Sequence, residues 1–429
     1  MNSSHLTNLN GVRGRSRYHA AMEHNTADRA PDADVLIVGA GPAGLALASA
    51  LSGLGLRCTI VEQQGLPLLE APGDDGREIA LTHRARRVLE SLGIWQHFSE
   101  GLISPMREAR VLDGDSPSAL RFSSTGDDAL GWLVPNHEIR RAALVQAISH
   151  PSVRLLCDAQ VTALETRGMF ARLTLADGRA LSAPLVVAAD SRFSQLRRMA
   201  GIGASMRDFG RTVVVGRIAH EKSNGGIALE CFRYGNTLAL LPMNGNQASA
   251  VITVASDRAG EWQALDDLAF AARIESQLGG RLGAIRSVGA RHAYPLVGVY
   301  AHRFAAPRFA LVGDAAVGMH PVTAHGYNFG LYGVEVLARS LAWAWHAGRD
   351  LGELSVLQPY ESTHRRTTLP VYLGTNAVVS LFTDESGYAK VARRAVLAVS
   401  ERAPGLSALI KGAIRRQLTG NGAAIAAGR

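Results

Sequence analysis

A glycine-rich turn between a predicted strand and a predicted helix constrains the fold of this chain more than any other feature. Residues 34–39 (DVLIVG) form an apolar run of strand length, and residues 42–54 carry Ala and Leu at helical spacing. The turn reads Gly39-Ala40-Gly41-Pro42-Ala43-Gly44. Its first glycine permits a tight turn, its second lets the backbone approach a pyrophosphate, and its third lets helix and strand pack closely. The pattern predicts a dinucleotide site with the phosphates at the helix N-terminus.

An acidic residue follows at the distance that this kind of site needs. Residues 57–62 (RCTIVE) predict a second strand, which ends at Glu62 and is followed by Gln63. Glu62 comes about twenty positions after the last glycine of the turn, as the dinucleotide-binding pattern requires. Its carboxylate suits the ribose hydroxyls of an unphosphorylated adenosine, and we place Gln63 in the same site. On this unit alone the cofactor is NAD or FAD.

Two more apolar strands each end at an aspartate. Residues 309–312 are followed by Gly313-Asp314, and residues 185–189 by Asp190, with Ser194 as a helix N-cap candidate. Each block taken alone also fits a plain turn or a capped helix start. Beside the glycine-rich turn, an aspartate in such a place can accept a hydrogen bond from a ribitol hydroxyl. The acids together therefore favour FAD over NAD.

The remaining periodicity predicts an α/β fold in which the FAD-binding domain is discontinuous. A helix is expected over 77–95, strands and turns alternate over 211–254, and a helix over 262–278 precedes a strand over 291–296. We predict a Rossmann-like FAD-binding domain with an inserted, mostly antiparallel β-sheet substrate domain and a helical C-terminus. The expected segments are a flexible N-terminal extension (1–32), three FAD-binding parts (33–100, 136–210, 301–350), two substrate-domain parts (101–135, 211–300) and a C-terminal helical region (351–429).

These blocks, in this order, resemble the single-component flavin aromatic hydroxylases of the para-hydroxybenzoate hydroxylase superfamily. Within it, the chain is similar to the ubiquinone-biosynthesis hydroxylases of the UbiH, UbiF and UbiM type, over nearly everything after residue 33. The signatures that carry this resemblance are Arg77-Glu-Ile-Ala-Leu-Thr, Asn136-His-Glu-Ile-Arg140, residues 238–242 (LALLP), His320-Pro321 and Gly326-Tyr327-Asn328.

The chain departs from this family at a few positions. Ser191 replaces the glycine after Asp190. Where the family has Gly-Gln-Gly and then an Asp, this chain has Ala324-His325-Gly326 and Tyr332-Gly333. The combination looks most like the UbiM branch.

The resemblance implies an enzyme with a specific cofactor. It implies a flavin-dependent monooxygenase that hydroxylates the ring of a polyprenylated ubiquinone precursor with O₂ and NAD(P)H, through a flavin hydroperoxide. FAD would be bound by the glycine-rich turn, Arg77, Arg140, Gly313-Asp314 and residues 326–328. NAD(P)H would be a transient co-substrate, because the chain has no second glycine-rich fingerprint.

The same resemblance implies the residues around the flavin ring. Pro321 would line the flavin face. His320 is the candidate acid–base residue near the phenol, since histidine titrates close to neutral pH, and His325 is a candidate ring-site donor. Both histidines also fit purely structural roles. Two other functions stay open: hydroxylation of a soluble phenolic compound, and a non-catalytic FAD-binding member of a quinone-synthesis complex.

Bulk composition narrows the partners. The 429 residues carry a formal net charge of +8, but the arginines are spread along the chain rather than clustered with aromatic residues, so we expect no nucleic-acid partner. No metal-binding motif is present, and no apolar run approaches the roughly 18 residues that span a bilayer. Three cysteines without a CxxC pair favour a reducing, cytoplasmic setting.

The two ends of the chain carry separate expectations. The C-terminal helices interleave apolar and basic residues, which suits peripheral contact with the inner face of the cytoplasmic membrane or with a quinone-synthesis complex. The first thirty residues fit a transit peptide, a disordered tail or a chain that starts at Met22.

Overall fold

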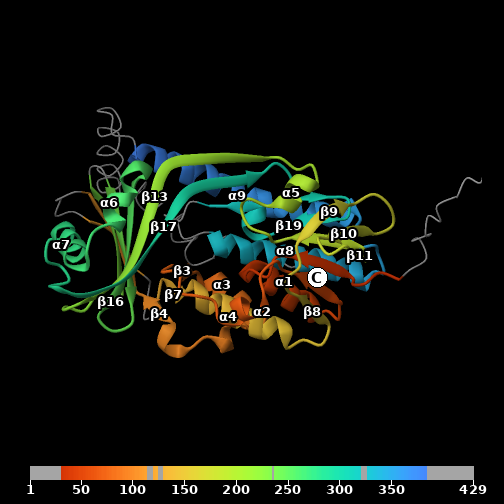
Figure 1. Cartoon of the computed structure of the whole chain (residues 1–429), viewed down its shortest axis with the longest axis horizontal. Helices are drawn as coiled ribbons and strands as arrows, with labels where there is room; N and C mark the ends of the chain where they lie inside the picture. The colour runs from red at the N-terminus through yellow and green to blue at the C-terminus, as the bar shows by residue number, and fades with distance from the viewer. Residues whose placement is uncertain (1–29, 114–118, 124–128, 234–235, 320–325, 384–429) are drawn as a thin grey trace, which may run out of the picture. The chain divides into compact units, whose positions relative to one another are not determined.

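The computed structural model describes residues 30–113, 119–123, 129–233, 236–319 and 326–383 (Figure 1). The predicted N-terminal extension and the C-terminal helices beyond residue 383 therefore lie outside the described residues. So do His320, Pro321 and His325.

A six-stranded sheet forms the centre of the nucleotide-binding part. Its order is β18-β19-β12-β1-β2-β8, and every neighbouring pair is parallel except β18 with β19. β1, β2 and β12 are buried at every position, which explains their unbroken apolar sequences. The strands are β1 (Val35–Val38), β2 (Cys58–Val61), β8 (Val153–Leu156), β12 (Leu185–Ala188), β18 (Ala305–Ala306) and β19 (Phe309–Leu311).

An eight-stranded sheet forms the second layer, in the order β20-β17-β13-β16-β15-β14-β5-β6. All its pairs are antiparallel except β14 with β5, so the predicted mostly antiparallel sheet is confirmed. Figure 1 shows β13 and β17 as the longest strands, reaching from α6 to α5. The strands are β5 (Glu108–Asp113), β6 (Ala119–Ser123), β13 (Ala204–His220), β14 (Ile227–Arg233), β15 (Asn236–Met243), β16 (Gln247–Ala255), β17 (Ile285–Ala301) and β20 (Val317–Gly318).

Helices α6 (Ala259–Gln263) and α7 (Asp267–Leu278) cover one face of this sheet. Trp262 and Phe270 pack there against a buried cluster that includes Leu229 and Cys231 of β14. The opposite face of the sheet is therefore the one left for the nucleotide-binding part and its ligands.

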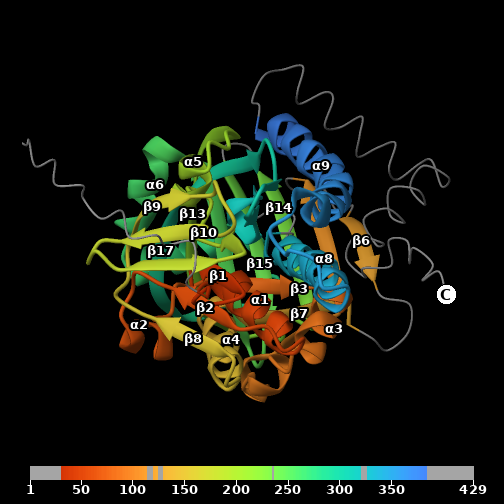
Figure 2. The ribbon, with the colours of Figure 1, turned by 90° about the vertical axis from the view of Figure 1, so that its right-hand side faces the viewer.

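Two three-stranded sheets and the remaining helices complete the fold. One sheet has the order β3-β7-β4 and the other β11-β10-β9. Figure 2 shows α8 and α9 side by side, and the two helices are in contact. These elements are β3 (Glu78–Leu81), β4 (Ser104–Met106), β7 (Gly131–Pro135), β9 (Val161–Glu165), β10 (Ala171–Leu175), β11 (Ala180–Ala183), α1 (Pro42–Ser52), α2 (Leu66–Glu70), α3 (His83–Ser91), α4 (Asn136–Ile148), α5 (Gln195–Met199), α8 (Gly326–His346), α9 (Leu354–Thr383) and the short 3₁₀ turn η5 (Gly313–Ala315).

The prediction of one helix over 77–95 is wrong at its start. Residues 78–81 form β3, which pairs antiparallel with β7. The helix begins only at His83, because the Thr82 side chain accepts a hydrogen bond from the Ala85 backbone and caps it. A strand partner more than fifty residues away therefore overrides the local helical pattern.

Two further element predictions need correction. The single helix over 262–278 is two helices, since Asp266 caps a new helix by accepting from the Ala269 backbone. Strand β13 starts at Ala204 instead of 211, because Gly210 at φ +60° lies in a β-bulge that lets the strand continue through a turn-like sequence. The predicted domain boundaries themselves stay a prediction.

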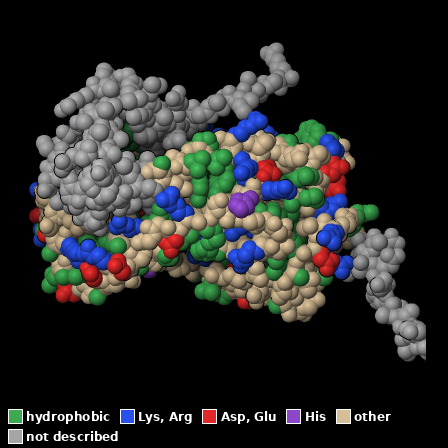
Figure 3. Space-filling view, turned by 90° about the horizontal axis from the view of Figure 1, so that it is seen from above, with side chains coloured by type: hydrophobic (Ala, Val, Ile, Leu, Met, Phe, Trp, Pro, Cys, Tyr) green, Lys and Arg blue, Asp and Glu red, His purple; other side chains and the backbone are tan. Residues whose placement is uncertain are grey.

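Charge on the described surface is mixed. On the face seen in Figure 3, Lys and Arg side chains are interspersed with acidic and hydrophobic ones. The net positive charge is therefore not gathered into one block on that face.

Candidate functional site

The glycine-rich turn joins β1 to α1 in a conformation that needs its glycines. Gly39 has φ +108°, and a Cβ there would lie 2.5 Å from the Ala189 carbonyl oxygen. A Cβ on Gly44 would lie 2.1 Å from the Gly39 carbonyl oxygen. By contrast, a Cβ on Gly41 would meet nothing within 4 Å. Two of the glycines thus serve packing, and the third borders open space.

That open space lies at the N-terminus of α1. Gly41 is the N-cap and offers no side chain to the first helical turn, and Pro42 occupies one of the first two helical positions. The N–H groups of the first turn remain available, and the helix dipole favours an anion there. The turn therefore fits the pyrophosphate of a dinucleotide.

Glu62 is held beside this turn. Its Oε2 accepts a hydrogen bond from the Ala40 backbone (2.7 Å), and its Oε1 accepts from the Gln64 backbone (2.9 Å). Gln63 is exposed. Arg140 on α4 donates to the Gln64 side chain (3.4 Å), so it lies at the same edge of the sheet. The predicted adenosine-side residues are thus neighbours.

The Gly313-Asp314 block converges on the same turn. Gly313 has φ +61°, and a Cβ there would lie 2.9 Å from the Ala43 side chain. A Cβ on Gly330 of α8 would lie 3.5 Å from the Gly313 Cα. Asp314 forms an ion pair with Arg192 (2.9 Å), a partner that the sequence did not predict. Three segments far apart in the sequence therefore meet at the start of α1.

Asp190 makes local contacts of a different kind. Its carboxylate accepts from the Ser194 hydroxyl (2.5 Å) and from two backbone N–H groups at the start of α5. Ser194 caps α5, as predicted. Ser191 adopts φ +87°, the left-handed region where the family's glycine is unstrained. The predicted contact of Asp190 with the cofactor stays a prediction.

The start of α8 is tied to β3 and α3. Asn328 Oδ1 accepts from the Thr82 backbone (3.0 Å) and hydroxyl (3.1 Å), and its Nδ2 donates to the Ala80 carbonyl (2.8 Å). Tyr327 has its hydroxyl buried, without a hydrogen-bond partner in the described part of the chain, and burial raises its pKa. Gly326 borders open space.

The departure at Gly333 has a physical explanation. A Cβ there would lie 2.7 Å from His364 Cε1. His364 is buried on α9, and burial lowers its pKa to about 3, so the imidazole is neutral. An aspartate at 333 would collide with this ring.

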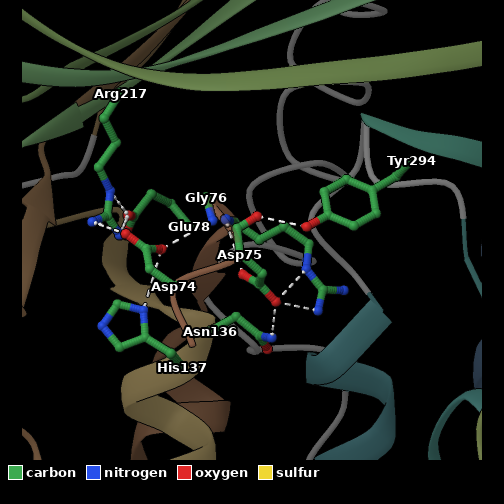
Figure 4. Close-up of polar contacts among 9 residues, drawn as sticks. Asp74, Asp75, Gly76, Glu78, Asn136, His137, Arg217 and Tyr294 are labelled. Carbon is green, nitrogen blue, oxygen red and sulfur yellow. Dashed lines mark hydrogen bonds and ion pairs between the residues drawn. The ribbon is translucent and has the colours of Figure 1, made fainter. Parts of the chain in front are cut away.

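Arg77 lies in a polar cluster shown in Figure 4. Its guanidinium donates to Asp75 (3.0 Å from Nε) and lies over the Tyr294 ring. Asp75 also accepts from the Asn136 side chain (2.7 Å), and its carbonyl accepts from the Tyr294 hydroxyl (2.6 Å). Arg77 and Asn136, both predicted from family signatures, are thus brought together.

The other half of this cluster joins the three-stranded sheet β3-β7-β4 to the eight-stranded sheet. Arg217 of β13 donates to Glu78 of β3 (2.7 Å) and to Asp74 (2.6 Å), and His137 lies 3.4 Å from Asp74 (Figure 4). The Glu78 side chain is 2% exposed, and burial raises its pKa to about 7 despite Arg217. The segment that carries Arg77 is therefore fixed against the eight-stranded sheet.

Comparison with known proteins decides the family. The family model described as an FAD binding domain matches residues 32–367. The ubiquinone hydroxylase UbiM of Neisseria meningitidis is 44% identical over 90% of this chain and 84% of its own length. The chain belongs to the ubiquinone hydroxylase family of FAD-binding proteins. It is a flavin-dependent monooxygenase whose cofactor is FAD, so the predicted resemblance, enzyme class and cofactor are confirmed.

Other ubiquinone hydroxylases and solved structures agree. The ubiquinone hydroxylase UbiL of Rhodospirillum rubrum is 38% identical over 86% of each chain, and the 3-demethoxyubiquinol 3-hydroxylase of Escherichia coli is 27% identical. The structure of p-nitrophenol 4-monooxygenase PnpA from Pseudomonas putida superposes with a TM-score of 0.72 over 91% of this chain and 99% of its own, at 17% identity. That likeness confirms the predicted fold class.

Some features of this hydroxylase fold were not found from the sequence. Arg192 and Arg217 have no local signal, because the acids they pair with are distant in the chain. The contacts of Asp75 with Asn136 and Tyr294 are distant as well. Glu230 has a local signal, because it is a lone acid within an apolar strand sequence (IALECF).

Among the described residues, no helix is long and apolar enough to cross a membrane, and no three His, Cys, Asp or Glu side chains form a metal-binding group.

Proposed function

We propose that this protein hydroxylates the aromatic ring of a polyprenylated ubiquinone precursor, with NAD(P)H and O₂ as co-substrates. The observation that carries the proposal is its identity of 44% and 38% with two proteins named as ubiquinone hydroxylases, along most of both chains. Bound FAD supplies the electron transfer from NAD(P)H and the activation of O₂.

The protein's own residues bind and orient. In this proposal the first turn of α1 binds the pyrophosphate and Glu62 binds the adenosine ribose. Gly313-Asp314 and residues 326–328 bind the ribitol and ring, with Arg77 beside the ring. Arg140 binds on the adenosine side, with Glu62. Gly41 supports the placement of the pyrophosphate at the first turn of α1, because it borders open space at that helix N-terminus. His320, Pro321 and His325 stay predictions for the ring site.

The proposal includes peripheral contact with the inner face of the cytoplasmic membrane or with a quinone-synthesis complex. The interleaved basic and apolar residues of the predicted C-terminal helices support it, since such a sequence pattern suits an interfacial helix. Binding to anionic liposomes, with and without the residues after Ser400, tests this part.

The main test is genetic and chemical. Deleting the gene and identifying the accumulating lipid by mass spectrometry is expected to reveal a prenylated quinone precursor that lacks one ring hydroxyl. Re-expression of the wild-type chain is expected to remove it. An unchanged quinone profile would point instead to a soluble phenolic substrate. Rescue by a chain that shows no substrate-dependent NAD(P)H oxidation would point to a non-catalytic role.

A further inference from the structure

Arg192 links the two aspartate blocks of the nucleotide-binding part. It follows Asp190 and Ser191 in the turn after β12, and its guanidinium reaches Asp314 in η5, 122 positions away. Nη2 and Nε both donate to one carboxylate oxygen, Oδ2, at 2.9 and 3.3 Å. In the part of the chain that the structure describes, Oδ1 of Asp314 has no hydrogen-bond partner. One oxygen of this carboxylate is therefore held, and the other is left for a ligand.

Arg192 is itself fixed by the eight-stranded sheet. Its Nη1 donates to the Val297 carbonyl of β17 (3.0 Å). Its Cβ lies against β20, since a Cβ on Gly318 would be 3.1 Å from it. Ser191, directly before it, adopts φ +87°, a strained backbone that persists only where the surrounding structure holds it. The place of the guanidinium is therefore set by groups other than Asp314.

The Asp314 carboxylate depends on this arginine. Among the described residues, Arg192 provides the only hydrogen bonds to that carboxylate. The Asp314 side chain is 35% exposed, so it is open to a ligand and would rotate freely without its partner. A side chain that is ordered only when a ligand binds lowers the affinity, because its lost rotamer freedom opposes binding. Arg192 removes that cost before the ligand arrives.

The two blocks stay joined without the Arg192 side chain. Arg197 of α5 is buried, and its Nη1 donates to the Ala315 carbonyl (2.9 Å) and to the Arg192 carbonyl (3.2 Å). Arg197 thus ties the backbone of the turn to the backbone of η5. The Arg192 side chain is left with a task that no other described residue performs, which is to hold the Asp314 carboxylate.

We propose that Arg192 is a positioning residue for FAD binding, which fixes Oδ2 of Asp314 so that Oδ1 accepts a hydrogen bond from a ribitol hydroxyl. This rests on the assignment of Gly313-Asp314 to the ribitol in the proposed function. A hydrogen bond to an ionised carboxylate is stronger than one between neutral groups, and it needs the carboxylate in one orientation. The turn after β12 then acts on the cofactor site through Arg192, while the Asp190 carboxylate accepts from the start of α5.

The test is a double-mutant cycle on the FAD dissociation constant. The full-length holoprotein is diluted, and the released FAD is measured by its fluorescence. Asp314→Ala removes the ribitol acceptor and is expected to raise the dissociation constant about 10–100-fold. Arg192→Met leaves the acceptor but frees it to rotate, so an increase of about 3–10-fold is expected. In the Asp314→Ala chain, Arg192→Met is expected to change the constant less than about twofold.

Further measurements separate positioning from charge and from folding. ADP has the pyrophosphate but no ribitol, so its dissociation constant, obtained by competition with FAD, is expected to be the same in wild type and Arg192→Met. Arg192→Lys keeps the positive charge and can still donate to one carboxylate oxygen, so it is expected to recover part of the FAD affinity. Arg110→Met breaks a pair of similar length and exposure with Glu108 (2.8 Å) in β5 and is expected to leave both constants unchanged.

Each contrary result identifies what fails. If Asp314→Ala leaves FAD affinity unchanged, the ribitol assignment fails and the role of Arg192 fails with it. If Arg192→Met weakens FAD binding equally with and without Asp314, or not at all, the ribitol assignment stands and Arg192 is not its positioning residue. Equal weakening of ADP and FAD binding would mean that the arginine attracts phosphate by its charge, which also overturns the positioning role. No substrate is hydroxylated in these measurements, so failure of the proposed reaction would show separately.

Discussion

Gly41 and Gly44 lie in the same turn, yet their neighbours predict different effects of the same substitution. Gly41→Ala places a methyl group in open space, on a backbone at φ −74° that alanine adopts freely. We expect the apoprotein to keep its free energy of unfolding, while the FAD dissociation constant rises about tenfold or more because the methyl meets the pyrophosphate. Flavin fluorescence titration measures the FAD dissociation constant, and urea unfolding measures the free energy of unfolding of the apoprotein.

Gly44→Ala is the matched control. Its methyl would lie 2.1 Å from a backbone oxygen, so α1 must move away from β1. We expect the apoprotein to lose about 1–3 kcal/mol or more, before any cofactor is added. If both variants lowered the apoprotein's free energy of unfolding equally, the assignment of Gly44 to packing and of Gly41 to cofactor binding would be contradicted.

At the scale of residues, the sequence predicted what depends on local backbone geometry. The glycines of the turn and the Ser194 cap could be assigned because their roles are set within a few positions. The Arg192–Asp314 pair could not, since its two residues are 122 positions apart. His320, Pro321 and His325 lie outside the described residues, so their roles stay predictions.

At the scale of elements, the first turn of α4 offers a pH-dependent test. Glu138 accepts from Arg141 (2.8 Å) and from the Ser99 backbone (2.7 Å). Burial alone would raise its pKa, but these donors outweigh burial and lower the pKa to about 2, from 4.5. A lowered folded-state pKa contributes stability that is complete above about pH 4.5 and is lost as pH falls towards 2.

Glu138→Gln is therefore expected to cost about 1–3 kcal/mol at pH 7. The difference from wild type should stay constant down to about pH 5 and shrink below it, which urea unfolding at several pH values measures. Glu90→Gln is the control, because Glu90 forms an exposed pair with Arg86 and should cost less than about 0.5 kcal/mol. A difference that widens in acid would overturn the assignment.

Elements were predictable where their own sequence determines them. β1, α1 and β2 follow from an apolar run, a glycine turn and helical spacing, and the structure has all three within a few residues. β3 was missed because its alternating residues become a strand only through pairing with β7. The bulge at Gly210 was missed for a related reason, since pairing with β17 before and after the bulge continues the strand through a turn-like sequence.

At the scale of the whole molecule, one ion-pair cluster joins the nucleotide-binding part to the eight-stranded sheet. Arg217→Met leaves Glu78, 2% exposed, without its cation. We expect a loss of about 3–5 kcal/mol at pH 8, where the carboxyl is charged. At pH 6 the loss should be smaller, because a folded-state pKa of about 7 already leaves wild-type Glu78 mostly neutral there. Urea unfolding at both pH values tests this.

The reverse substitution should behave differently. Glu78→Gln leaves Arg217 with a second partner, Asp74, at 2.6 Å, so we expect it to cost less than Arg217→Met at pH 8. Combining both substitutions should recover part of the loss, since no buried charge then lacks a counter-charge. Arg286→Met, which breaks an exposed pair with Glu221, should cost less than about 1 kcal/mol. Additive losses in the double variant would mean that the Arg217–Glu78 pair does not couple the β3-β7-β4 sheet to the eight-stranded sheet. The Arg77 segment would then be positioned by Asn136 and Tyr294 instead.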